Sequence, residues 1–167
     1  MNPDPLKYYY NDTLLYNEKY DNTIYHIVDS LLIPRYYINY GIANMPTNYE
    51  VENKPGMTIY EEILKNEWAY IANVNETKNH LHVLYKYNNE SVDVFYDKRN
   101  KKLLSFDGLA INNINLYNCD IVGSTKQSFF GVIDPMQLVN DNPDQSIVQS
   151  LELNENSNPV IFKIKLD

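Results

Sequence analysis

The sequence predicts a mainly β fold, built from antiparallel meanders and interrupted by two or three short helices. Three observations predict it: runs rich in β-branched and aromatic residues recur along the chain, short polar turns separate them, and only a few segments carry helix-start signals. The chain has 167 residues, 44% of them hydrophobic, which is enough for a globular domain with its own core. We therefore expect residues 1–167 to form a single domain.

The first predicted strands occupy residues 23–28 and 35–40. Both runs are rich in Ile, Val and Tyr, and Pro34 suits the start of the second strand because proline has no N–H for a ladder bond. Residues 29–34 join the two runs. These runs therefore read as consecutive strands of one sheet.

Four β-rich runs separated by three short polar turns follow between residues 68 and 106. This pattern predicts one four-stranded antiparallel sheet. In the run 80–87, alternation places Leu81 and Val83 on one face and His80 and His82 on the other. We expect the first face to pack into the core and the histidine face to be wetter.

Helix-start signals occur at three places. Thr58 with Glu61 fits the capping-box pattern and predicts a short helix that begins after Thr58. Asp134 and Asn142 each place a capping side chain before a proline at the first helical position. They predict a short helical insertion over residues 135–151. A last strand is predicted at 158–166, where apolar residues alternate with outward lysines.

Meanders of about 40 to 50 residues are typical of β-propeller blades. Four motifs point the same way: NTIY at 22–25, RYYINYG at 35–41, VFYDK at 94–98 and NPVIFKIKL at 158–166. Taken in this order, they resemble the "6-bladed β-propeller" family of Bacteroidales, whose members are mostly secreted or surface lipoproteins of undefined function.

The resemblance implies a partial propeller of about three blades. Members of the family are about twice as long as this chain, so it resembles their C-terminal half and reads as a fragment of a larger propeller. The resemblance also implies a cell-envelope or secreted location, although the N-terminus shows no signal-peptide pattern. It carries over no catalytic residue.

Charge and motif content argue against several classes of function. The net charge of −8 would repel nucleic-acid backbones and anionic lipid, and no run approaches the roughly 18 apolar residues of a membrane span. Cys119 is the single cysteine, so neither an internal disulfide nor a thiolate zinc site is expected. Neither a phosphate-binding glycine loop nor a serine-nucleophile motif is present, and we expect no cofactor.

Four residues form a candidate metal site. His80 and His82 lie two apart on one predicted strand, so their side chains point the same way and could share a metal with Asp93 or Asp97. Plain surface histidines are the alternative. Residues 97–102 form the one basic cluster, which reads as an anion-binding loop or, more simply, as a solvated hairpin tip.

The candidate ligand surface is aromatic. Tyr36 and Tyr37 could form stacking platforms for sugar rings or peptide side chains, and so could the tyrosines at 8–10. Strand alternation offers a simpler account, with one ring turned inward and the next outward.

Two functions remain open. The first is a non-catalytic interaction module that binds a glycan, a peptide or a surface protein. The second is a propeller hydrolase or lyase with a His/Asp site that could depend on a metal. A third interpretation assigns no function: the chain is then a truncated gene product without a role of its own. Three blades alone would leave two open faces, so we also expect a homodimer in which two copies complete a six-bladed ring.

Overall fold

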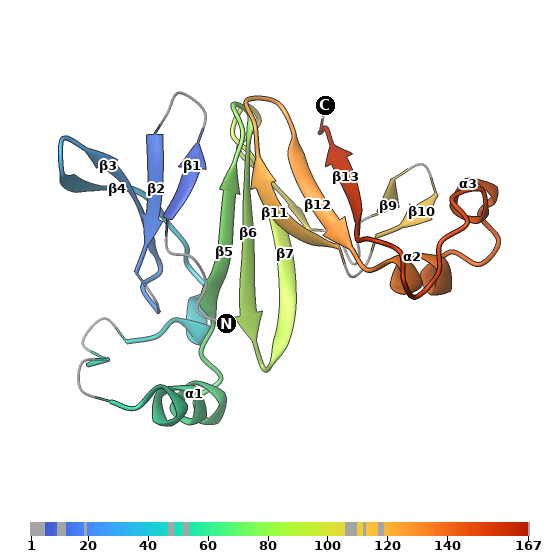
Figure 1. The fold of residues 1–167 in the computed structure, drawn as a ribbon. Coiled ribbons are helices and arrows are strands. Elements are labelled where there is room, and N and C mark those ends of the chain that lie inside the picture. Colours follow the sequence, from blue (N-terminus) through green and yellow to red (C-terminus); the bar gives the residue numbers. More distant parts are fainter. Residues whose placement is uncertain are drawn as a thin grey trace.

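The computed structural model describes residues 6–9, 13–18, 20–46, 49–51, 54–105, 110–111, 113–116 and 119–166. Within these residues the chain forms three antiparallel sheets of three or four strands and one small hairpin. Figure 1 shows the three sheets standing next to one another. The predicted mainly β fold with few short helices is confirmed.

Sheet 1 contains four strands in chain order: β1 (Leu6–Tyr9), β2 (Thr13–Asn17), β3 (Thr23–Val28) and β4 (Leu31–Tyr37). Strand β4 begins four residues earlier than expected. Asp29 and Ser30 both have positive φ, the geometry of a tight hairpin turn, so pairing starts at once with Val28 opposite Leu31. Pro34 lies inside β4, where it is tolerated because β4 is an edge strand.

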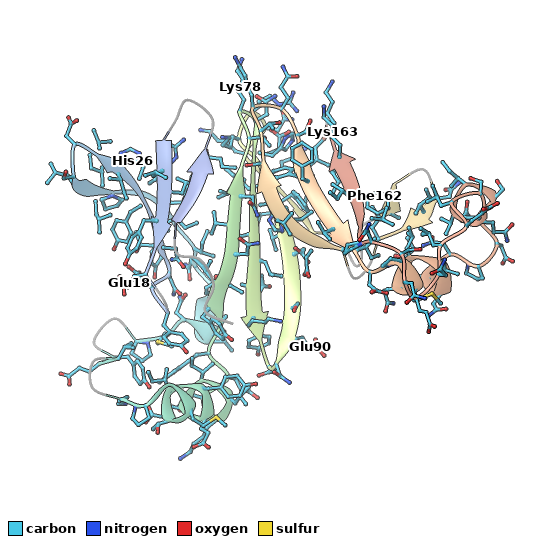
Figure 2. All side chains as sticks on the ribbon, in the orientation of Figure 1. Glu18, His26, Lys78, Glu90, Phe162 and Lys163 are labelled. Carbon is cyan, nitrogen blue, oxygen red and sulfur yellow. The ribbon has the colours of Figure 1, made fainter. Side chains whose placement is uncertain are left out.

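Sheet 2 is the predicted meander. Its strands are β5 (Tyr70–Glu76), β6 (His80–Tyr87), β7 (Glu90–Asp97) and β8 (Lys102–Ser105), also in chain order. Neighbouring strands pair antiparallel, and Glu90 lies at the hairpin end of the sheet opposite to Lys78 (Figure 2). The four-stranded sheet expected between residues 68 and 106 is confirmed.

Sheet 3 contains β11 (Asp120–Ser124), β12 (Phe129–Ile133) and β13 (Val160–Ile164). The hairpin of β9 (Ala110–Ile111) and β10 (Ile114–Asn115) precedes it. On β13, Phe162 is half-buried and Lys163 is exposed, as alternation predicts (Figure 2). Lys163 therefore faces solvent from the edge of sheet 3.

The helical elements are η1 (Gly41–Ala43), α1 (Gly56–Lys65), α2 (Pro135–Asp141) and α3 (Ser146–Gln149). The predicted capping box at Thr58 is wrong, because α1 begins three residues earlier, directly after Pro55. The cap of α2 is confirmed: the Asp134 carboxylate accepts hydrogen bonds from the backbone N–H groups of Met136 and Gln137.

The second predicted cap in the helical insertion is wrong. Asn142 lies at the C-terminal end of α2 and does not begin α3. Its side chain instead donates to the carbonyls of Asn115 and Leu138 and accepts from the N–H of Asn115. Asn142 therefore joins α2 to the β9–β10 hairpin.

Two apolar clusters hold the sheets face to face. Leu15 and Ile24 of sheet 1 are buried against one face of sheet 2, and Phe95 of sheet 2 is buried against Ile121 and Phe129 of sheet 3. The first strands of the three sheets, β1, β5 and β11, lie beside one another (Figure 1). This is the radial arrangement of consecutive propeller blades.

Candidate functional site

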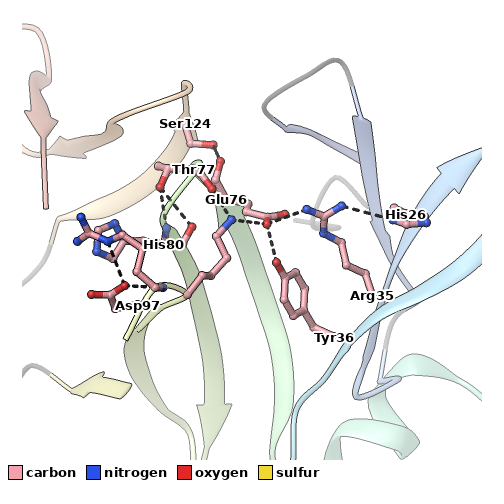
Figure 3. A network of polar contacts seen from close by, with 10 residues as sticks. His26, Arg35, Tyr36, Glu76, Thr77, His80, Asp97 and Ser124 are labelled. Atoms are coloured by element: carbon pink, nitrogen blue, oxygen red, sulfur yellow. Dashed lines mark hydrogen bonds and ion pairs between the residues drawn. The ribbon is translucent and has the colours of Figure 1, made fainter. Parts of the chain in front are cut away.

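A buried carboxylate links sheet 1 to sheet 2. Glu76, at the end of β5, has a fully buried side chain. Its Oε1 accepts hydrogen bonds from Arg35 Nη2 at 3.0 Å, Tyr36 Oη at 2.6 Å and Lys98 Nζ at 2.7 Å (Figure 3). Because Arg35 and Tyr36 belong to β4 and Lys98 follows β7, one oxygen joins the two sheets.

The pKa values in this cluster follow from burial and from the shared carboxylate. Burial and the hydrogen bond to Glu76 both raise the pKa of the Tyr36 phenol. Burial lowers the pKa of the Lys98 ammonium, against the opposite effect of Glu76. The Tyr36 hydroxyl is thus a neutral donor to Glu76 at physiological pH, which fits a structural role better than proton transfer.

Strand β5 and the turn after it are also bonded to sheet 3 and its β11–β12 turn. Ser124 donates from its hydroxyl to the backbone carbonyl of Glu76 at 2.7 Å. The Asn73 amide donates to the carbonyl of Ile121 at 2.7 Å, and the Lys78 N–H donates to the carbonyl of Lys126 at 2.9 Å. Polar bonds therefore fix the position of β5 between its two neighbouring sheets.

The histidine face of β6 is buried, so the expectation of a wetter face is wrong. The His82 side chain is 0% exposed, and its ring packs against Phe95 and Phe129 at centroid distances of 4.8 and 6.1 Å. The reason is that sheet 3 covers this face. A strand pattern reports which residues share a face, but it does not report what covers that face.

The four predicted metal ligands do not meet at one point. His82 Nε2 lies 2.6 Å from Asp93 Oδ1. His80 is buried, which lowers the pKa of its imidazole, and its Nε2 has no hydrogen-bond partner among the described residues. In the part of the chain that the structure describes, no three His, Cys, Asp or Glu side chains lie close enough to hold a metal.

Asp97 organises the β7–β8 turn. Its carboxylate accepts from the backbone N–H groups of Arg99 and Asn100 and from the Asn100 amide. Burial would raise the pKa of Asp97, but these hydrogen bonds outweigh it and hold the pKa well below its usual range. The expected basic hairpin tip is only partly solvated, since Lys98 turns inward to Glu76.

The two candidate tyrosines on β4 point in opposite directions. Tyr36 is directed inward to Glu76, whereas the neighbouring Tyr37 is exposed. This is the inward and outward pairing that strand alternation suggested. The side chains of the tyrosines at 8–10 lie outside the part of the chain that the structure describes.

A groove lies between sheet 2 and the segment that leaves sheet 1. Its volume is about 390 Å³. Its lining is apolar or aromatic except for one asparagine: Ile38, Asn39, Tyr40, Ile42, Ala43, Ala69, Val83, Tyr85, Tyr87, Val94 and Leu103. We call this the inter-sheet groove.

Two tyrosines shape the inter-sheet groove. The rings of Tyr40 and Tyr85 lie 5.0 Å apart between centroids and are tilted by 47°. The Tyr40 hydroxyl is buried without a hydrogen-bond partner among the described residues, and burial raises its pKa. Sequence reasoning missed this groove; the available signal was that Ile38, Tyr40 and Ile42 continue the apolar alternation beyond the end of β4.

Three adjacent antiparallel sheets with neighbouring first strands define a partial β-propeller. The family model described as "6-bladed beta-propeller" matches residues 1–126, and the chain belongs to this family. Together with the fold, this confirms the propeller part of the expected resemblance. The lipoprotein character and the Bacteroidales origin remain predictions.

The fold is also similar to a crystal structure from Bacteroides fragilis, that of a protein described as a "Putative exported protein". The TM-score is 0.71 at 17% sequence identity, and the match covers 97% of this chain and 49% of the other. This chain thus spans about half the length of that protein. No curated protein matches the sequence of this chain. No helix among the described residues is long and apolar enough to cross a membrane.

Proposed function

We propose that this chain is a non-catalytic binding module of an exported or cell-envelope β-propeller protein. One observation carries the proposal: apart from one asparagine, the inter-sheet groove is lined by apolar and aromatic side chains, without a charged group among the described residues that line it. Such a surface offers apolar area for binding, and no carboxylate, imidazole, amine or thiol lies among its described lining residues. The similarity to a protein described as exported supports the location.

The pair of His82 and Asp93 is weak support for an enzyme, despite its contact of 2.6 Å. Catalysis by His82 would need its imidazole to reach a substrate. The ring is 0% exposed, packs against two phenylalanine rings and already uses Nε2 in the contact with Asp93. The pair therefore supports a structural role between sheets 2 and 3.

The ligand of the module is a glycan, a peptide or a surface protein. The exposed ring of Tyr37 and the rim of the groove at Ile42 and Leu103 are surfaces that such a ligand could contact. Exposed aromatic and aliphatic side chains of this kind are common at binding sites.

Glycan and peptide arrays probed with the labelled, purified chain test the proposal. A Leu103→Asp variant places a charge at the rim of the groove, and an Asp93→Asn variant removes the charge next to His82. We expect array binding that falls by about tenfold in Leu103→Asp and persists in Asp93→Asn. Chemical conversion of an array ligand by the parent chain, lost in Asp93→Asn, would instead establish the hydrolase or lyase.

A further inference from the structure

We infer that one end of sheets 2 and 3 binds an anionic glycan, a polysaccharide that carries sulfate or carboxylate groups. This surface is distinct from the inter-sheet groove, and its role goes beyond the proposed function. Three features support the inference: the distribution of charge over the molecule, the position of three hairpin turns and the residue types in those turns.

Positive charge gathers at this end. More than half of the chain's 14 Lys and Arg residues lie in or next to the turns β5–β6, β7–β8 and β11–β12: Lys78, Lys98, Arg99, Lys101, Lys102, Lys126, Lys163 and Lys165. We call this surface the basic end. Figure 2 shows Lys78 and Lys163 at the same end of the molecule.

Hydrogen bonds hold the three turns next to one another. The Lys78 N–H donates to the carbonyl of Lys126 at 2.9 Å, and the Lys98 N–H donates to the carbonyl of Asn79 at 2.8 Å. Strand β13 pairs with β12, which places Lys163 beside the β11–β12 turn. The cations of two sheets therefore share one surface.

The carboxylates at this end do not neutralise that surface. Glu76 and Asp97 are buried, with side chains 0% and 7% exposed, and both accept hydrogen bonds from groups of the protein itself. By contrast, Lys78, Lys101 and Lys163 are exposed, and none of them forms an ion pair with a carboxylate among the described residues. These ammonium groups are available to a ligand.

Exposed acidic residues lie toward the other end of the sheets, where Figure 2 shows Glu18 and Glu90. Strand β6 alone, with 8 residues, separates the two ends of sheet 2 by about 26 Å. Charges in physiological salt are screened over about 8 Å. The net charge of −8 therefore does not describe the field that an anionic ligand meets at the basic end.

The residue types favour a glycan over a protein or a membrane. The turns read TKN at 77–79, KRNK at 98–101 and TKQS at 125–128, without an apolar or aromatic residue. Protein partners usually need aromatic anchors, and binding at a membrane surface usually adds apolar insertion to charge. Single-stranded nucleic acid binds through aromatic stacking. The cations, with the amide groups of Asn79 and Gln127 beside them, suit the charged groups and hydroxyls of a polysaccharide.

The spread of the cations favours a polymer over a single ion. They occupy three turns of two sheets, so a small anion could contact only a few of them at once. All but Arg99 are lysines, which act as point charges and lack the fixed fork that arginine offers to one planar anion. Such a set suits charges repeated along a flexible chain.

Dextran sulfate and dextran test the inference, because they share a backbone and differ in charge. Fluorescence anisotropy of each labelled polymer, titrated with the purified chain, measures binding. We expect dextran sulfate to bind, and its affinity to fall at least tenfold between about 50 and 200 mM salt, because binding releases counterions. Dextran should not bind. Equal binding of both polymers, or no binding of dextran sulfate at low salt, would overturn the inference.

A matched pair of double variants locates the binding surface. Lys78→Gln with Lys163→Gln removes two charges from the basic end, whereas Lys65→Gln with Lys86→Gln removes two charges from α1 and from the far end of β6. Both variants change the net charge equally. We expect dextran sulfate to bind about tenfold more weakly to the first variant and within about twofold of the parent affinity to the second. Equal losses in the two would show that only net charge matters, and the assignment to the basic end would be wrong.

Competition separates the glycan from other polyanions. Heparin that displaces labelled dextran sulfate at least as well as unlabelled dextran sulfate does would support the inferred class. A DNA duplex or phosphatidylglycerol vesicles that displace it far better than heparin would overturn that class in favour of a nucleic acid or a membrane.

The basic end and the inter-sheet groove can fail separately. If dextran sulfate does not bind but an array ligand is lost in Leu103→Asp, the inference is wrong and the proposed function stands. If the variant of Lys78 and Lys163 loses dextran sulfate while Leu103→Asp leaves all array binding unchanged, the inference stands and the groove assignment is wrong.

Discussion

At the position of Glu76, three donors from two sheets meet one carboxylate oxygen. Arg35 and Lys98 bring two positive charges to a fully buried side chain, and each is itself largely shielded from water. Removing one partner of a buried ion pair costs far more than the pair contributes to stability, because the remaining charge stays buried. Glu76 is therefore the residue at the sheet junction that is most sensitive to substitution.

Replacing Glu76 with Ala should lower the free energy of unfolding by about 3 kcal/mol, since two cations and the Tyr36 hydroxyl lose their common acceptor. Chemical denaturation measures this change. Glu90→Ala, at an exposed position on β7, is the control and should change stability little. Equal losses in the two variants would show that the junction does not depend on the carboxylate.

The lowered pKa of Asp97 predicts that the free energy of unfolding falls in acid. Its folded pKa lies below the unfolded value of about 4, so its contribution is fully present above that pH and is lost as pH falls toward the folded pKa. Asp97→Asn should flatten the decline in melting temperature between about pH 4 and pH 2. Asp144→Asn, at an exposed position, is the control. An unchanged slope in Asp97→Asn would contradict the assignment.

At the scale of single elements, the sequence predicts strands better than helix starts. The sheet at 68–106 was predictable because its β-rich runs and polar turns are local signals. The start of β4 was not predictable in this way, because a positive-φ turn at Asp29 and Ser30 shortens the loop before it. The Asn142 cap failed since its amide is used by Asn115, a partner distant in sequence.

The candidate site was less predictable than the fold, for a physical reason. His80 and His82 were placed correctly on one face of β6, but sheet 3 buries that face. The inter-sheet groove forms between segments from two sheets, and no spacing within either segment encodes it. Packing between sheets decides both features, and a strand pattern contains no information about it.

Sheet 3 contains a packing constraint that a small substitution tests. A Cβ added at Gly131 would lie 2.2 Å from Cys119 Sγ, far inside contact distance. Gly131→Ala should therefore destabilise the protein by about 1–3 kcal/mol through overpacking. Cys119→Ala in the same chain should recover most of the loss, because it removes the clashing sulfur. The double-mutant cycle measures this coupling, and additive effects would refute the contact.

Burial also accounts for the chemistry of Cys119. It raises the pKa of the thiol to about 11, so little thiolate forms near neutral pH. Cys119 is thus a packing residue between β11 and the neighbouring elements.

At the scale of the whole molecule, two sheet faces have no neighbour among the described residues. Val122 and Ile161 are exposed on the face of sheet 3 opposite to Ile121, and Leu32 and Tyr37 are exposed on the face of sheet 1 opposite to Ile24. In a six-bladed ring each of these faces would meet another blade. Exposed apolar faces of this kind favour association.

The chain on its own should therefore form a two-fold dimer, with sheet 1 of one copy against sheet 3 of the other. Light scattering coupled to size exclusion over a dilution series measures the mass. Ile161→Lys should shift the equilibrium toward the monomer by placing a charge in the interface. A monodisperse species of 19.6 kDa at micromolar concentration would contradict the dimer.

The central claim is that this partial propeller binds a ligand in the inter-sheet groove. Methyl-selective NMR of the chain, titrated with the neutral aromatic dye N-phenyl-1-naphthylamine, tests this claim most directly. The shifted methyl signals report where the dye binds. The account predicts shifts for the methyl groups of Val83, Val94 and Leu103, and none for those of Val122 and Ile161. Shifts confined to Val122 and Ile161, with the groove methyl groups unchanged, would contradict it.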